Sequence, residues 1–263
     1  MTEISAALVK ELRDRTGAGM MDCKRALTET GGDIDAAVRL LREWGAASAE
    51  KRAGRETTEG LVLTRIENGL GAIVGVGCET EPVSKNEEFR AFAERALETA
   101  FSGEDLGSLE PQRVELVGKI GENIAVLDSA RFTAVDSGAI DSYVHPPANK
   151  LGVLVQVRGG PPELPRKIAM HIAAASPRWI GRDDVPEEVV TSERQIYSNS
   201  DEVQGKPEQA REKIVEGMLN KRFFAAQVLA EQPWIHDTAK TVGQALEEEG
   251  AEVLEFERLA LTG

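Results

Sequence analysis

The side chains best suited to metal or acid–base chemistry are three histidines, His145, His171 and His236. Metal sites on helices usually place a second ligand three or four residues after the first, and none of these histidines has one there. His171 lies within an apolar helical pattern, which favours a hydrogen-bonded histidine at the edge of the core. The sequence therefore predicts no metal site.

The two cysteines offer thiol chemistry only if the fold supplies a base. Cys23 and Cys78 lie in apolar contexts and form no C-x-x-C pair, so neither a disulfide framework nor a zinc site is predicted. A Cys78 nucleophile with a distant histidine base stays open as an alternative, because such partners meet only in space. Apart from that alternative, we expect a protein that is not an enzyme and needs no cofactor.

The segment TGAGMMDCK at 16–24 contains glycines that could suggest a phosphate-binding loop. A P-loop has four residues between its glycines, continues with Lys-Ser or Lys-Thr and follows a strand, whereas a helix is predicted before this segment. The segment instead offers Met20 and Met21, whose flexible, polarizable side chains suit a partner surface. Because neighbouring side chains of a helix face different ways, we expect one methionine to pack inward and the other to contact a partner.

Composition limits the possible partners and compartments. The 263 residues are 41% hydrophobic, enough for two or three small domains with cores of their own. The formal net charge of -14 argues against direct nucleic-acid binding, which requires clustered Lys and Arg. The N-terminal stretch lacks the apolar core of a signal peptide, and no run is long and apolar enough for a membrane helix. We expect a cytoplasmic protein.

The elements that position these residues begin with three short amphipathic helices, marked by apolar stripes within 4–12, 20–27 and 34–41. Glycines separate the helices, and Gly45 is predicted to end the third. The polar, basic stretch over 46–59 then indicates a linker or an extended helix tail. We place a domain boundary at residue 54.

The central part of the chain shows one pattern twice, a β-hairpin followed by a helix, which indicates an internal duplication. The first hairpin turns at Asn68-Gly69, the strongest short hairpin signal. Strand signals lie within 61–80, 140–144 and 152–157, and helical or apolar-periodic signals lie within 89–100, 114–124 and 168–175.

The last part of the chain is predicted to contain a projecting helical hairpin over 186–226, broken at Gly205-Lys206-Pro207, then a final helix and strand. The fold class is therefore α+β. It comprises an N-terminal three-helix module with the start of a linker, two duplicated α+β core subdomains and the protruding hairpin. The predicted domains are 1–54 for the module, 55–138 for the first core subdomain, and 139–263 for the second with the hairpin.

Seven segments in order along nearly the whole chain resemble the elongation factor Ts family, the guanine nucleotide exchange factors of the translational GTPase elongation factor Tu. That resemblance implies an N-terminal module of the ubiquitin-associated type, two duplicated core subdomains and a projecting helical hairpin. The segments are LVKELRDRTGAGMMDCKRAL at 8–27, CETEPVSKNEEF at 78–89, VGKIGENI at 117–124, SYVH at 142–145, HIAAASP at 171–177, GKPEQAREKIVEGML at 205–219 and EQPWIHD at 231–237.

The resemblance also implies which residues bind the GTPase. The helical module would dock on its nucleotide domain through Met20, Met21, Asp22 and Lys24. In the core, Ile124 and His145 would support the interface, while Ile235 and His236 would face another domain of the GTPase.

A second contact resembles the family's Thr-Asp-Phe-Val turn, whose acidic and aromatic residues push into the nucleotide domain and disturb its Mg²⁺ site. Here the turn reads Thr80, Glu81, Pro82 and Val83. Glu81 keeps the charge on a side chain one methylene longer. Pro82 keeps apolar bulk and stiffens the turn, but it lacks the aromatic ring.

Two functional interpretations follow from the resemblance. The first is a translation elongation factor that promotes GDP release from elongation factor Tu by displacing its Mg²⁺ and phosphate-binding elements. The alternative is a diverged paralogue that binds or stabilises the GTPase with weak exchange, because Pro82 replaces the family's Phe. Neither interpretation needs a catalytic group.

Overall fold

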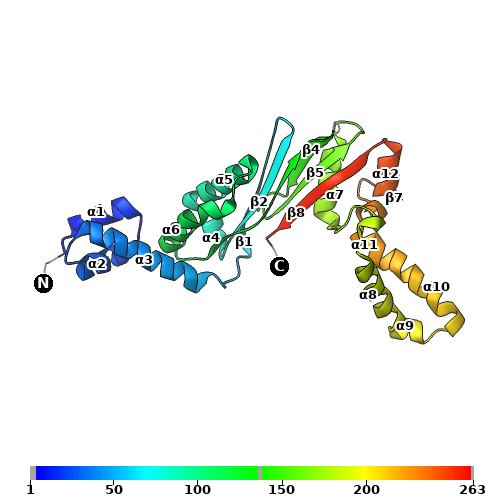
Figure 1. Ribbon diagram of the computed structural model, residues 1–263, viewed down its shortest axis with the longest axis horizontal. Helices are drawn as coiled ribbons and strands as arrows, with labels where there is room; N and C mark the ends of the chain where they lie inside the picture. Colours follow the sequence, from blue (N-terminus) through cyan, green and yellow to red (C-terminus); the bar gives the residue numbers. More distant parts are fainter. Residues whose placement is uncertain (1–3, 136–137, 262–263) are drawn as a thin grey trace.

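The computed structural model describes residues 4–135 and 138–261. Residues 1–3 and 262–263, at the two ends of the predicted domains, and residues 136–137, in the predicted first core subdomain, lie outside the described residues. Figure 1 shows an elongated molecule, with a helical module at one end, two β-sheets with their helices in the middle and a helical hairpin at the other end. This confirms the α+β class.

The N-terminal module consists of α1 (Ala6–Thr16), α2 (Met20–Glu29) and α3 (Ile34–Arg52). Local capping explains its boundaries: Ser5 accepts a hydrogen bond from the Leu8 amide, and α1 ends at Gly17 in the left-handed conformation, with φ 68°. The three helices share a small core, which contains Val9, Leu12, Cys23, Ala26, Leu27 and Ala37.

The prediction that the third helix ends at Gly45 is wrong, because α3 continues to Arg52. Gly45 is retained inside the helix because α3 crosses α6 (Glu110–Ile120) there: a Cβ on Gly118 would lie 3.0 Å from the Gly45 Cα. Farther along α3, Ala49 is buried in the core beneath the first sheet. The stretch after Gly45 is therefore a helix tail that joins the module to the core.

The first sheet has the order β1-β2-β3, formed by β1 (Glu59–Glu67), β2 (Leu70–Cys78) and β3 (Ile124–Thr133). The β1–β2 turn has positive φ at Asn68 and Gly69, as a two-residue hairpin of this sequence requires. Between β2 and β3 the chain forms α4 (Glu81–Ser84), α5 (Glu87–Ser102), η1 (Leu106–Leu109) and α6.

The apolar stretch over 114–124 is not continuous. The helix α6 ends at Ile120, because Gly121 takes the left-handed conformation with φ 82°, and Ile124 already begins β3. The strand β3 itself was not predicted.

The second sheet has the same arrangement, in the order β4-β5-β8. It contains β4 (Ala139–Val144), β5 (Leu151–Arg158) and, from the end of the chain, β8 (Glu252–Ala260), with α7 (Leu164–Ala175) following β5. In both sheets the middle strand is the second of the hairpin, and it pairs antiparallel with a third strand that returns after the helices. This common topology supports the predicted duplication.

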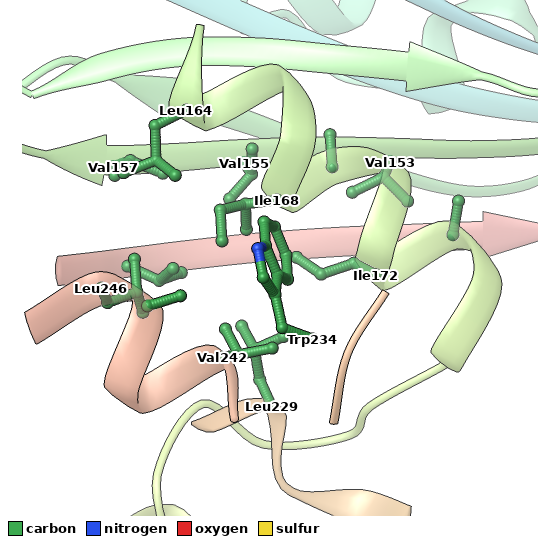
Figure 2. Packing of buried hydrophobic residues seen from close by; sticks show 14 residues of the cluster. Val153, Val155, Val157, Leu164, Ile168, Ile172, Leu229, Trp234, Val242 and Leu246 are labelled. Carbon is green, nitrogen blue, oxygen red and sulfur yellow. The ribbon is translucent and has the colours of Figure 1, made fainter. Parts of the chain in front are cut away.

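The two sheets pack face to face through a shared apolar layer, formed by Val62, Ile73, Phe132, Leu154, Leu259 and Leu261. Helices cover the outer faces, α5 and α6 on the first sheet and α7 on the second. Figure 2 shows Ile168 and Ile172 of α7 packed between β5 and Trp234. The short α12 (Val242–Glu248) closes that core.

The helical hairpin projects from the second sheet's side of the molecule (Figure 1) and consists of α8 (Glu187–Ser198), α9 (Asp201–Gln204) and α10 (Glu208–Met218). It has an apolar cluster of its own, centred on Leu219 and Val203. The chain returns through η3 (Leu219–Phe224), α11 (Ala225–Gln227), η4 (Leu229–Glu231) and the short strands β6 (Pro233–Trp234) and β7 (Asp237–Thr241), while η2 (Arg182–Asp184) precedes the hairpin.

Candidate partner-binding site

The predicted turn at Thr80–Val83 is a single helical turn, α4, at the end of β2. Thr80 is its N-cap residue, and Pro82 lies in the first turn, where a missing N–H is tolerated. The side chains of Glu81 and Pro82 are exposed, whereas Val83 is half-buried against the core of the first sheet. The turn thus presents one acid and one apolar ring to solvent.

Glu81 lies beside Lys85, with 2.7 Å between its Oε1 and the lysine Nζ. The hydrogen bond from Lys85 lowers the pKa of Glu81, so this carboxylate is charged at neutral pH. Both side chains are about two-thirds exposed, so the pair contributes little to stability. An incoming cation or amide could therefore take the place of Lys85.

The two methionines of α2 are both exposed, Met20 by 58% and Met21 by 74%. The expectation that one of them packs inward is therefore wrong. The inward face of α2 belongs to Cys23, Ala26 and Leu27, and the first turn of the helix extends beyond the small core. The module thus exposes a larger apolar surface than the sequence predicts.

The charged neighbours on this helix are exposed as well. Asp22 forms an ion pair with Arg25, at 3.1 Å, and Lys24 points to solvent on the same short helix. All four predicted contact residues of the module are therefore accessible.

Ile124 and His145 have different surroundings. Ile124 is fully buried and pairs with Cys78 in the sheet, so it can support a surface near the α4 turn without touching a partner. His145 is exposed, and its Nδ1 lies 2.9 Å from the Tyr143 hydroxyl. The loop after His145 reaches the same end of the sheets as the turn, because its Lys150 forms an ion pair with Glu59, the residue opposite Cys78.

Ile235 and His236 lie at the far side of the second core, beside α7. Ile235 is 42% exposed, and the ring of His236 stacks edge-on against the buried Trp234, with 4.7 Å between centroids. The underlying His171 is fully buried and bonds to Gln232 at 2.9 Å, and burial lowers its pKa. His171 is therefore a core residue, as predicted, and the exposed Ile235 and His236 lie against α7 of the second core, whereas the turn lies on the first.

The described residues contain no cluster of His, Cys, Asp and Glu able to hold a metal ion. The buried Cys78 thiol donates to the Thr80 carbonyl, and its pKa is raised to about 12, first by desolvation and then by Glu122 and Glu59. A thiol with that pKa is protonated at neutral pH and is a poor nucleophile. The geometry gives the Cys78 enzyme alternative no support.

No helix within 4–135 and 138–261 is both long and apolar enough to cross a membrane. What the site offers chemically is contact: exposed apolar side chains on two helices and one charged carboxylate on a fixed turn.

Comparison with known proteins identifies the family of the chain. The family described as Elongation factor TS matches residues 79–262, from the α4 turn to the last strand. The chain belongs to the elongation factor Ts family. Elongation factor Ts of Erwinia tasmaniensis is 44% identical over 98% of this chain and 91% of its own length, and that of Serratia proteamaculans is 43% identical over the same shares. Elongation factor Ts of Escherichia coli O139:H28 is also 44% identical.

Membership makes the chain a translation elongation factor at the level of the family. The family resemblance directed attention to the turn and the methionines, but it did not reveal what holds the turn. Glu122 accepts a hydrogen bond from the Thr80 amide, and Glu79 accepts one from the Asn123 amide. Glu122 falls within the segment VGKIGENI, so a signal was present, although its contact with Thr80, 42 residues away, could not be derived from spacing.

Proposed function

We propose that this chain promotes GDP release from elongation factor Tu by deforming the Mg²⁺ and phosphate pocket of that GTPase. The observation that supports this most is the α4 turn, which presents the exposed Glu81 and Pro82 from a fixed position on the core. The exposed Met20 and Met21 supply a second contact, so binding and deformation can be separate tasks. We propose the cytoplasm as the place of action.

The mechanism is a linkage between two ligands of one GTPase. A factor that binds the nucleotide-free state better than the GDP-bound state must weaken GDP binding by the same coupling free energy. Weakening GDP a thousandfold requires about 4 kcal/mol. GTPases hold nucleotide through P-loop amides, a lysine and Mg²⁺, so displacing these elements suffices and the factor needs no catalytic group.

In this mechanism the turn and the remaining contacts have distinct roles. The Glu81 carboxylate, ionised at neutral pH, would compete for the cationic groups around the phosphates, and the Pro82 ring would occupy space beside them. Met20 and Met21 would anchor the helical module on the nucleotide domain, with Asp22 and Lys24 at the rim of that contact. Ile124, buried opposite Cys78, would support the core contact beside the turn, and the exposed His145 would extend it.

Ile235 and His236 would contact a second domain of the GTPase. They lie together in the turn between β6 and β7, beside α7, where the Ile235 amide donates to His171 Nδ1 at 3.4 Å, and the apolar side chain of Ile235 is exposed. A contact there would hold the GTPase at two distant places, so that the turn acts on a fixed target.

The test measures the rate at which fluorescent GDP leaves elongation factor Tu at increasing concentrations of the chain. We expect the rate to rise and to saturate. An unchanged rate at saturating chain would refute the proposal, as would equal affinity for the empty and the GDP-bound GTPase.

The second candidate is a paralogue that binds the GTPase but exchanges nucleotide weakly. The observation that favours it is Pro82, since burying a Phe side chain stabilises a complex by roughly 1.5–3 kcal/mol, about ten- to a hundredfold in rate. Pro82→Phe separates the two, because the exposed position accepts a larger side chain without repacking the core. A large gain in GDP release supports the paralogue, and a small change supports exchange through Glu81 and Pro82 as they stand.

A further inference from the structure

The α4 turn is held from outside by a carboxylate that belongs to another part of the chain. Glu122, in the connection between α6 and β3, accepts the Thr80 amide at 3.0 Å on Oε2 and the Thr80 hydroxyl at 2.6 Å on Oε1. Both oxygens of one carboxylate are thus used on one residue. Hydrogen bonds to a charged acceptor are about twice as strong as neutral ones.

The hydroxyl of Thr80 does not perform the usual task of an N-cap residue. An N-cap Thr normally accepts a hydrogen bond from an amide of the first helical turn, but Thr80 makes no side-chain cap bond in α4. Its hydroxyl donates to Glu122 instead. The orientation of α4 therefore depends on a residue outside the helix.

A second carboxylate makes the reciprocal bond. Glu79, directly before Thr80, accepts the Asn123 amide at 2.6 Å, so each of the two neighbouring segments provides a carboxylate to the backbone of the other. Arg55 adds a bond to Glu79, and the buried Asn123 side chain donates to the Arg55 carbonyl at 2.8 Å. The Asn123 bond, followed by Arg55, lowers the pKa of Glu79, so its carboxylate remains ionised.

We infer that Glu122 is a positioning residue for nucleotide exchange, which orients the Thr80–Val83 turn through its two hydrogen bonds to Thr80. The inference rests on the proposed function. Glu122 does not need to touch the GTPase: its side chain is half-buried, and both of its carboxylate oxygens are engaged by Thr80. Its effect falls on the deformation step, because the exposed methionines of α2 are on a different helix and keep their binding contact.

The experiment compares Glu122→Ala with the wild-type chain in GDP release from elongation factor Tu. Losing charge-assisted bonds to a turn that acts on the nucleotide pocket should lower the rate at saturating chain about tenfold. The chain concentration for half-maximal release should stay within about twofold, since α2 still binds. Glu122→Gln keeps an oxygen acceptor and should recover part of the rate. Glu115→Ala, which removes an exposed acid of α6 paired with Lys119, is the matched control. It should promote GDP release from elongation factor Tu at the wild-type rate.

A readout independent of the GTPase is the exchange of the Thr80 amide with deuterated solvent in the isolated chain. Glu122→Ala should speed exchange at Thr80 and leave amides of the β2 interior protected. In a chain that already carries Glu81→Ala and Pro82→Ala, the turn tip, meaning the side chains of Glu81 and Pro82, is absent. Glu122→Ala should then lower the rate of GDP release little further, because no tip remains to be oriented.

Three results would overturn the inference: an unchanged rate at saturation in Glu122→Ala, a full additional loss in the chain without the turn tip, or unaltered exchange at Thr80. If the wild-type chain does not promote GDP release from elongation factor Tu, the proposed function fails. Amide exchange at Thr80 alone then decides whether Glu122 holds the turn.

Discussion

The two exposed methionines give the most direct test of the proposed contact. Met20 is 58% and Met21 74% exposed, so truncating both to Ala removes few contacts within the chain. Full burial of a Met side chain contributes roughly 1.5–3 kcal/mol. Scaled by the exposed fractions of the two side chains, the double truncation should remove roughly 2–4 kcal/mol of association free energy, which raises the Kd about thirtyfold to several hundredfold.

The assay is calorimetric titration of nucleotide-free elongation factor Tu with each variant, together with a thermal melt of the free chain. Met170→Ala is the matched control, since Met170 is 36% exposed on α7, far from α2. It should leave the Kd unchanged. The reasoning is refuted if the double variant binds like the wild type, or if its affinity falls only together with its melting temperature.

Three further predictions concern the core. Cys78 should resist iodoacetamide at pH 8 in the native chain and react in urea. Because its pKa is raised to about 12 in the folded chain, the free energy of unfolding should fall as pH rises above about 8.5, where the thiol of the unfolded chain ionises. Gly118→Ala should force α3 from α6 at Gly45 and lower the free energy of unfolding by about 1–3 kcal/mol in urea denaturation, whereas Gly217→Ala, in open space on α10, should raise it by about 0.5–1. Because burial lowers the pKa of His171, urea stability should fall as pH drops below about 6.5, and a flat profile would contradict this.

Much of the fold was predictable because its elements carry local signals. The Asn68-Gly69 turn fixed the first hairpin, and the apolar stripe of α5 faces its sheet as the periodicity predicts. The long α3 was harder, because a glycine usually marks a helix end. At Gly45 the need for close approach to Gly118 outweighs the low helix propensity of glycine.

The strand β3 was missed because it lies at an edge of its sheet and alternates poorly. Leu127 is 47% exposed, and the strand contains a bulge opposite Gly75 and Val76, which breaks the period of two that sequence patterns detect. The end of α6 could have been found from Gly121, a typical helix C-cap glycine after Lys119.

The candidate site shows the same division between local and long-range information. The residues of the turn and of α2 were found through the family resemblance, and their exposure is consistent with contact. The bonds between Glu122 and Thr80 bring together residues far apart in the sequence, and no single-chain pattern encodes that pairing. The inward or outward direction of Met20 likewise depends on where the small core of the module ends.

The crossing of α3 and α6 has a consequence for any protein that touches both ends of this surface. Because the two glycines let the backbones of α3 and α6 approach closely, the helical module packs directly on the core, and this packing restricts the separation of α2 and α4 in the free chain. A rigid pair of contacts loses less conformational entropy on association than two contacts joined by a flexible tether. The first contact to form then brings the second into register, so that little further ordering of the factor is needed before it can act.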